Sequence, residues 1–241
     1  PGRDPLSITE KEGRHRGAGG GSLRAAVFGI NDGLVSNLSL TMGVAGADPG
    51  SSVVLLAGLA GLLAGAFSMA TGEYVSMKTQ RELLERELEL ERAELEENPE
   101  EEKEELALIY RAKGLPADDA QRIADRLISN RDTALDTLAR EELGLDPDEL
   151  GSPIGAAVSS FIAFAIGATI PVAPYVFAAG QGAFTLSAVL SAVALLTVGG
   201  STALLTGRSI LFGAGRMFGL GAIAAGVTYA VGKVLGVAVG G

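Results

Sequence analysis

The chain has 241 residues, of which 47% are hydrophobic, and a formal net charge of −10. It contains no cysteine, which excludes disulfides, thiolate metal sites and cysteine nucleophiles. The sequence has no Gly-x-Ser-x-Gly elbow, phosphate-binding loop or His/Cys metal motif, so neither hydrolysis nor ATP-driven pumping has candidate residues. We therefore predict that the protein is not an enzyme, and we expect no nucleic-acid partner. The single histidine, His15, lies in a Gly/Arg-rich tail and is expected to be solvated.

The acidic side chains are concentrated in one internal stretch. Between Lys78 and Leu150 the sequence has 23 acidic and 11 basic side chains, a local net charge of −12, and the rest has only 6 acidic and 8 basic ones. Nearly charge-free flanks around a charged insert are typical of membrane spans around an extramembrane domain. We divide the chain into a polar tail (1–22), two spans (23–77), an acidic helical domain (78–150) and three further spans (151–241).

Five apolar stretches are long enough to cross a bilayer as helices, which takes about 20 apolar residues. They are Leu23–Ala47, Val53–Met77, Ile154–Ala179, Ala183–Thr206 and Ile210–Val239. Short polar or Pro/Gly turns separate neighbouring stretches. We therefore predict an all-α integral membrane protein with five transmembrane helices in contact with lipid, and with a cytosolic insert between the second and third.

Lys and Arg side chains predict the direction of the spans, because they gather on the cytosolic side. The N-terminal tail, the start of the acidic insert and the turn with Arg208 carry basic residues, whereas the turns near Asp48 and Gln181 carry none. The N-terminus and the acidic insert are therefore expected in the cytosol and the C-terminus on the far side. A compact chain without organelle signals favours a bacterial cytoplasmic membrane.

Small residues four positions apart occur in the second and fifth stretches, and this spacing favours close helix packing. The pairs are Gly61/Gly65, Gly215/Gly219 and Gly232/Gly236. Two interpretations stay open: packing within one subunit, or a seam between two copies of the chain.

The acidic insert is predicted to form three helices, the first of them continuous with the second span. Residues 78–113 are rich in Glu, Leu, Lys and Arg and are interrupted only at Asn98-Pro99, where Pro99 suits the first turn of a second helix. A third helix is expected from about Asp118 to about Leu143, closed by Gly144.

Glutamates gather on the faces of these predicted helices. They are Glu87, Glu91 and Glu94 on the first helix, Glu102 and Glu105 on the second, and Glu141 and Glu142 at the end of the third. Residues three, four or seven positions apart share a helix face, where like charges repel unless cations neutralise them. Oxygen ligands suit Mn²⁺, Fe²⁺, Mg²⁺ or Ca²⁺ rather than copper. A solvated acidic face is the alternative interpretation, and spacing alone does not separate the two.

Two acidic residues lie inside predicted spans, Asp32 in the first and Glu73 in the second. Such groups are costly in a bilayer and are functional candidates by default. At a rise of about 1.5 Å per residue, Asp32 and Met69 each lie about 12 Å from the cytosolic surface. Ser36 shares a face with Asp32, and Met69 and Glu73 form a stripe toward the cytosolic mouth. A carboxylate and a thioether form a plausible transient Fe²⁺ site, where protons compete with the metal and allow metal/proton exchange.

Five short segments carry a family resemblance. In chain order they are residues 28–35 (FGINDGLV), 64–70 (AGAFSMA), 72–74 (GEY), 142–145 (ELGL) and 170–175 (IPVAPY). With these motifs in this order, the sequence resembles the vacuolar iron transporter family, in its bacterial type, from about residue 22 to the C-terminus. The resemblance implies a homodimer of five-span subunits with an ion path near the dimer axis. It also implies export of Fe²⁺ or Mn²⁺ from the cytosol in exchange for protons.

The resemblance assigns roles to individual residues. It implies that Asp32 and Met69 form the mid-membrane site. It implies that the metal ligands of the cytosolic domain are Glu91, Glu94, Glu102, Glu105 and Glu142. Glu87, Glu141 and Ser36 are possible additions from spacing.

Two positions depart from plant members of the family. Gly61 stands where plant members have a glutamate, and Glu73 is expected to take over near the cytosolic mouth. Leu138 and Ala139 stand where the plant domain has a methionine pair. The cytosolic site is therefore expected to be all-oxygen, which weakens any preference for Fe²⁺ over Mn²⁺.

The sequence as a whole predicts a homodimeric, proton-coupled exporter of Fe²⁺ or Mn²⁺ that needs no cofactor besides the ion it carries. The alternative is a membrane-anchored metal sensor or scaffold, whose acidic domain binds metal or a basic partner without transport. A sensor has no need of Asp32 in the bilayer, so normal function of an Asp32→Asn protein would favour the alternative.

Overall fold

The computed structural model describes residues 20–144 and 151–239, which form helices joined by short turns and contain no strand. The predicted all-α class is therefore confirmed for the described residues. The predicted polar tail up to residue 19, with His15, and the end of the acidic insert, residues 145–150, lie outside them. The described residues divide into two compact units, one within 1–75 and 152–241 and the other within 76–151.

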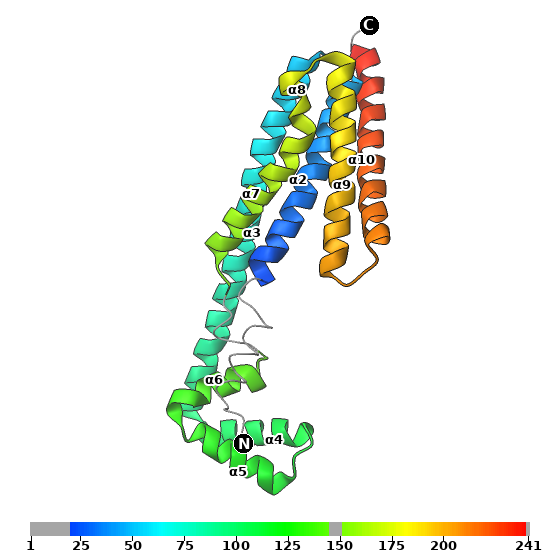
Figure 1. Ribbon diagram of the computed structural model, residues 1–241. Helices are drawn as coiled ribbons and strands as arrows, with labels where there is room; N and C mark the ends of the chain where they lie inside the picture. The colour runs from blue at the N-terminus through cyan, green and yellow to red at the C-terminus, as the bar shows by residue number, and fades with distance from the viewer. Residues whose placement is uncertain (1–19, 145–150, 240–241) are drawn as a thin grey trace. The chain divides into compact units, whose positions relative to one another are not determined.

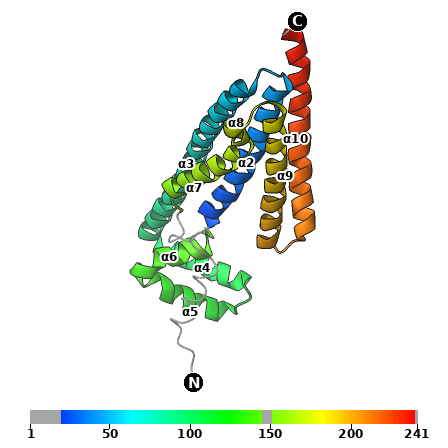
Figure 2. The same cartoon turned by 45° about the horizontal axis from the view of Figure 1, so that its top comes forward.

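The first unit is a helical bundle. Its helices are α2 (Gly20–Gly46), the first part of α3 (Ser51–Glu97), α7 (Pro153–Val172), α8 (Pro174–Phe177), α9 (Gly180–Leu205) and α10 (Ile210–Val239). Figures 1 and 2 show α2 (blue) between α7 on one side and α9 and α10 on the other. Its side chains form much of the core, because Leu34, Leu38 and Met42 are buried together with Leu195 of α9.

Glycines allow α2, α3 and α7 to approach one another closely. A Cβ atom on Gly33 of α2 would collide with the backbone carbonyl of Phe164 in α7. On α3, a Cβ atom on Gly65 would collide with the ring of Phe164, and one on Gly61 would meet side chains of α2. The Gly61/Gly65 pair therefore packs within the chain, the first of the two interpretations drawn from the sequence.

The glycine pairs of α10 have different surroundings. A Cβ atom on Gly232 would overlap the carbonyl oxygen of Gly43 in α2, and one on Gly236 would collide with Ala47, directly after α2. The Gly232/Gly236 pair thus packs within the chain as well. A Cβ atom on Gly215 or Gly219 would meet nothing within 4 Å among the described residues, so the face of α10 that carries these two glycines is open.

Four of the described helices, α3, α7, α9 and α10, are long and apolar enough to cross a membrane. Helix α2 is not among them, although it has 27 residues, and it carries Arg24, Asp32 and Asn37. Four of the five predicted spans therefore have the length and composition of membrane-crossing helices. That α2 also crosses the membrane stays a prediction.

The prediction of one continuous helix over Ile154–Ala179 is wrong. Helix α7 ends at Val172, and the four-residue α8 occupies Pro174–Phe177. Pro171 and Pro174 have no amide hydrogen to donate to the preceding turn, and the ring of each crowds the carbonyl group four residues before it. The chain therefore turns here instead of continuing as a helix to Ala179.

The second unit contains the last part of α3 with α4 (Pro99–Ala112), α5 (Ala117–Ile128) and α6 (Arg131–Glu141). Its apolar core consists of Leu106, Ala107, Ala124, Ile128, Ala134 and Leu138. Helix α3 runs without a break to Glu97, and Pro99 begins α4, as the sequence predicts.

The third helix predicted for the insert is in fact two helices. The backbone N–H of Ser129 closes α5 by donating to the carbonyl of Asp125 at 3.2 Å, and Asn130 precedes α6 in an extended conformation. Short polar side chains such as these compete with the helix for backbone hydrogen bonds, which weakens a helix at this point. Helix α6 ends at Glu141, and Gly144 follows with a positive φ of 65°.

Candidate metal sites

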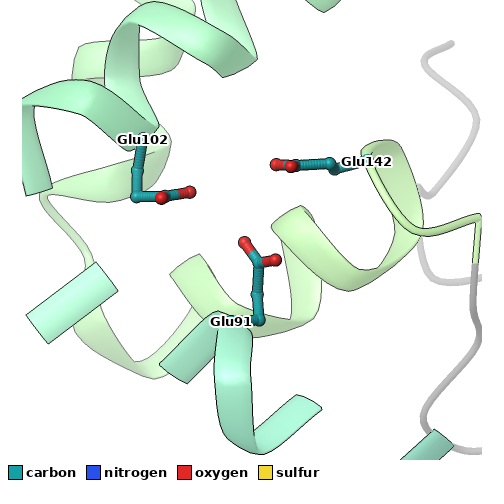
Figure 3. Close-up of side chains that lie close together, drawn as sticks. All are labelled: Glu91, Glu102 and Glu142. Atoms are coloured by element: carbon teal, nitrogen blue, oxygen red, sulfur yellow. The ribbon is translucent and has the colours of Figure 1, made fainter. Parts of the chain in front are cut away.

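Three glutamates converge in the second unit. Glu91 lies on α3, Glu102 lies on α4 and Glu142 follows α6. One carboxylate oxygen of each lies within 4.8 Å of the other two, and Figure 3 shows the side chains pointing toward one another. Glu91 and Glu102 are only 3% and 5% exposed, and Glu142 is exposed. Metal–oxygen distances of about 2.0–2.6 Å allow oxygens at this spacing to surround one divalent cation.

Burial and mutual repulsion make this cluster retain protons. Burial, followed by the charge of Glu142, raises the pKa of Glu91 to about 7, and the same causes raise the pKa of Glu102 to about 7. The pKa of Glu142 is also raised, first by the partial desolvation of its carboxyl group beside the cluster and then by the charge of Glu105. One carboxylate oxygen each of Glu91 and Glu102 is buried without a hydrogen-bond partner among the described residues. A divalent cation would supply both the missing partner and the missing positive charge.

The other predicted glutamate ligands lie outside this group of three. Glu94 and Glu105 are exposed, yet their charges contribute to the raised pKa values within the cluster. Glu141 instead pairs with Lys113, and Glu87 is exposed one helical turn before the cluster. The structure thus brings together one predicted ligand from each of three helical segments.

A cavity in the first unit collects polar side chains of α2 and α3. It has a volume of about 300 Å³, and its lining includes Asp32, Ser36 and Asn37 of α2 and Ser68 and Met69 of α3. The sequence predicts a common depth for Asp32 and Met69, and in the structure both line this cavity. The Ser36 hydroxyl donates to the backbone carbonyl of Asp32 at 2.5 Å. A carboxylate, a thioether and hydroxyl oxygens together suit a borderline cation.

Glu73 lies one helical turn beyond Met69 and is not part of the cavity lining. Its side chain is only 9% exposed and accepts a hydrogen bond from Arg24 of α2 at 3.1 Å. Arg24 itself is 59% exposed, so its guanidinium remains largely solvated. The sequence did not predict the pairing of Arg24 with Glu73, because no spacing rule relates residues this far apart in the chain.

Sequence reasoning also missed Asn37. The available signal was an amide inside a predicted span, but spacing did not link it to Asp32, because residues five positions apart are rotated by about 140° around a helix.

Comparison with known proteins decides the family. A sequence model described as the VIT family matches residues 23–233. The chain belongs to the VIT family. Its relatives include the "Vacuolar iron transporter" of Acanthamoeba castellanii, 38% identical over 220 residues that cover 88% of this chain and 78% of the relative. The "Vacuolar iron transporter 1" of Oryza sativa subsp. japonica is 32% identical over 214 residues, covering 88% and 85%. The "Vacuolar iron transporter" of Toxoplasma gondii is 36% identical over 229 residues, covering 90% and 76%.

Membership in the VIT family confirms the resemblance drawn from the motifs. Together with the four long apolar helices, it identifies an integral membrane protein. The region matched to the VIT family contains both the cavity beside Asp32 and the cluster of Glu91, Glu102 and Glu142.

Proposed function

We propose that this VIT-family protein carries Fe²⁺ or Mn²⁺ out of the cytosol in exchange for protons, as a homodimer. The observation that carries the proposal is the cavity among apolar helices that both Asp32 and Met69 line. A carboxylate at membrane depth is costly unless it serves an ion or a proton, and a thioether beside it favours a borderline metal ion. The names of the relatives support iron as cargo, and the dimer follows the family resemblance.

The acidic cluster of Glu91, Glu102 and Glu142 is the proposed loading site on the cytosolic side. With two carboxyl pKa values at about 7, the cluster is partly protonated at neutral pH. A cation that binds there displaces protons and ends the repulsion among the carboxylates. The site has only oxygen donors, so it accepts Mn²⁺ as readily as Fe²⁺.

The proposed path in the membrane runs from Glu73 past Met69 to Asp32. Without metal, Glu73 forms an ion pair with Arg24 at 3.1 Å. A passing cation takes the place of the guanidinium group in this pair. At Asp32 a cation and a proton compete for one carboxylate, and this competition couples the two flows. No nucleotide or redox group is needed for such an exchange.

The proposed topology has α2 as the fifth crossing helix, with the N-terminus and the acidic insert in the cytosol of a bacterial cell. The Lys and Arg residues of the predicted cytosolic segments support this direction. Helix α2 is shielded by α7, α9 and α10, so it can cross a membrane with a more polar surface than its neighbours.

The test is Mn²⁺ and Fe²⁺ uptake by purified protein in liposomes with an imposed pH gradient. Wild type is compared with Asp32→Asn and with a matched control, Asp48→Asn, which makes the same change in the exposed α2–α3 turn. Gradient-dependent flux is expected in the wild type and in the control, and Asp32→Asn is expected to abolish it.

A second pair of variants separates loading from transport. Glu91→Gln with Glu102→Gln is expected to slow the flux at low metal concentration without abolishing it, and the exposed pair Glu89→Gln with Glu104→Gln is expected to change little. Absence of flux in the wild type, despite metal binding to the acidic cluster, would exclude transport and leave the sensor or scaffold alternative.

A further inference from the structure

Asn37 lies in the middle of α2 and is only 2% exposed. Its amide nitrogen donates two hydrogen bonds, to the carbonyl of Gly58 in α3 at 3.2 Å and to the carbonyl of Ala168 in α7 at 2.7 Å. Both N–H groups are therefore used, and the amide cannot turn over without losing them. The side chain is held in one orientation by two neighbouring helices.

Asn37 belongs to the wall of the cavity beside Asp32, and its amide oxygen is the polar atom that these two hydrogen bonds leave over. Asn37 Oδ1 is buried and has no hydrogen-bond partner among the described residues. Of the buried side chains with such an unpaired oxygen, Asn37 is the one that lines this cavity. An acceptor that stays buried and unpaired costs free energy, which is the usual sign of a ligand or water at that place.

Gly61 on α3 lies next to this buried oxygen. A Cβ atom on Gly61 would lie 2.8 Å from Asn37 Oδ1, and it would collide at a still shorter distance with the end of the Leu40 side chain. Gly61 lines the same cavity. A side chain at position 61 would therefore press on the oxygen.

We propose that Asn37 Oδ1 is a ligand for the cargo cation: it supplies a neutral oxygen to the divalent ion that Asp32 and Met69 hold in the cavity. This inference rests on the proposed transport function and adds a binding residue to it. A hard amide oxygen beside a soft thioether shifts the site toward Mn²⁺ and Fe²⁺ and away from softer ions such as Cd²⁺. Asn37 therefore sets the selectivity of the site as well as its affinity.

Two variants separate the oxygen from the amide nitrogen. Gly61→Ala places a methyl group against Oδ1 and keeps the amide nitrogen, whereas Asn37→Leu removes the whole amide. Gly226→Ala on α10 is the matched control, because a Cβ atom there meets nothing within 4 Å among the described residues. Gly61→Ala keeps the test decisive if Asn37→Leu does not fold.

The measurements are KM and kcat for Mn²⁺ uptake into liposomes, and inhibition of that uptake by Cd²⁺. Loss of one neutral oxygen from the ion is expected to raise KM for Mn²⁺ about tenfold. Half-inhibition of Mn²⁺ uptake is expected at a lower ratio of Cd²⁺ to Mn²⁺ in Gly61→Ala and Asn37→Leu than in wild type and Gly226→Ala. A purely structural amide would lower the yield or kcat without changing the metal preference.

The inference is overturned if Gly61→Ala has the KM and the Cd²⁺ sensitivity of the wild type while Asp32→Asn still abolishes flux. That result would leave the proposed function intact, and it would mean that Asn37 only links α2 to α3 and α7 through hydrogen bonds. Absence of flux in the wild type would overturn the proposed function, and this inference with it.

Discussion

Binding of Mn²⁺ to the acidic cluster is expected to weaken steeply below neutral pH. The cation needs ionised carboxylates, and the pKa values of Glu91 and Glu102 are raised from 4.5 to about 7 by burial and by neighbouring carboxylates. Protons therefore compete with the metal near pH 7, where ordinary glutamates would be fully ionised.

The expected change in affinity for Mn²⁺ follows from the fraction of protein molecules in which both Glu91 and Glu102 are ionised. For two independent groups with a pKa of about 7, this fraction is about 0.8 at pH 8, about 0.25 at pH 7 and about 0.01 at pH 6. The apparent affinity for Mn²⁺ should therefore fall about 100-fold from pH 8 to pH 6. Two glutamates with an ordinary pKa near 4.5 would lose only about a tenth of their affinity over that range.

The assay is calorimetric titration of the full chain in detergent with Mn²⁺ at pH 6, 7 and 8. Repeating the titration at pH 7 in buffers of different ionisation enthalpy measures the protons released, which should be about one per Mn²⁺. Glu91→Gln is expected to reduce both the affinity and the proton release, and the exposed control Glu89→Gln should change neither. Equal affinity at pH 6 and pH 8 would refute the reasoning, because it would mean that the cluster is fully ionised without metal.

Three further predictions concern the bundle and the insert. Arg24→Ala leaves Glu73 buried without its partner. Because Arg24 is exposed, the expected loss of unfolding free energy is only about 1–2 kcal/mol. Thermal unfolding in detergent measures this loss, and an equal loss from Arg24→Ala in a Glu73→Gln background would contradict the prediction. Gly232→Ala forces α10 away from α2 and should cost about 3 kcal/mol, whereas Gly219→Ala on the open part of α10 should cost nothing measurable in the same assay. Leu138→Ala removes a fully buried side chain from the insert core and should cost about 2–5 kcal/mol by denaturant unfolding, so a loss below about 1 kcal/mol would contradict the assigned core.

The pH also acts on the stability of the metal-free protein. A carboxyl group whose pKa is raised on folding binds protons more tightly in the folded state than in the unfolded state. The contribution of Glu91 and Glu102 to folding is therefore greatest below about pH 4.5 and is lost as the pH rises through about 7. A bound cation removes this loss, so Mn²⁺ should raise the unfolding temperature more at pH 8 than at pH 6.

The sequence alone determined the features that depend on neighbouring positions. Apolar length predicted the long helices, and Pro99 marked the break between α3 and α4. A rise of about 1.5 Å per residue put Asp32 and Met69 at one depth. Such features are predictable because the backbone repeat relates positions within one helix, and because the short motifs of the family are contiguous in the chain.

The tertiary structure decided which side chains meet across helices. It selected Glu91, Glu102 and Glu142 from a larger set of glutamates with suitable spacing. The pairing of Arg24 with Glu73 and the clamping of Asn37 by α3 and α7 also had no signal in local spacing. The turns and the close approach of glycines set how each helix is rotated against the next, and this rotation decides which polar group faces a cavity and which faces a partner.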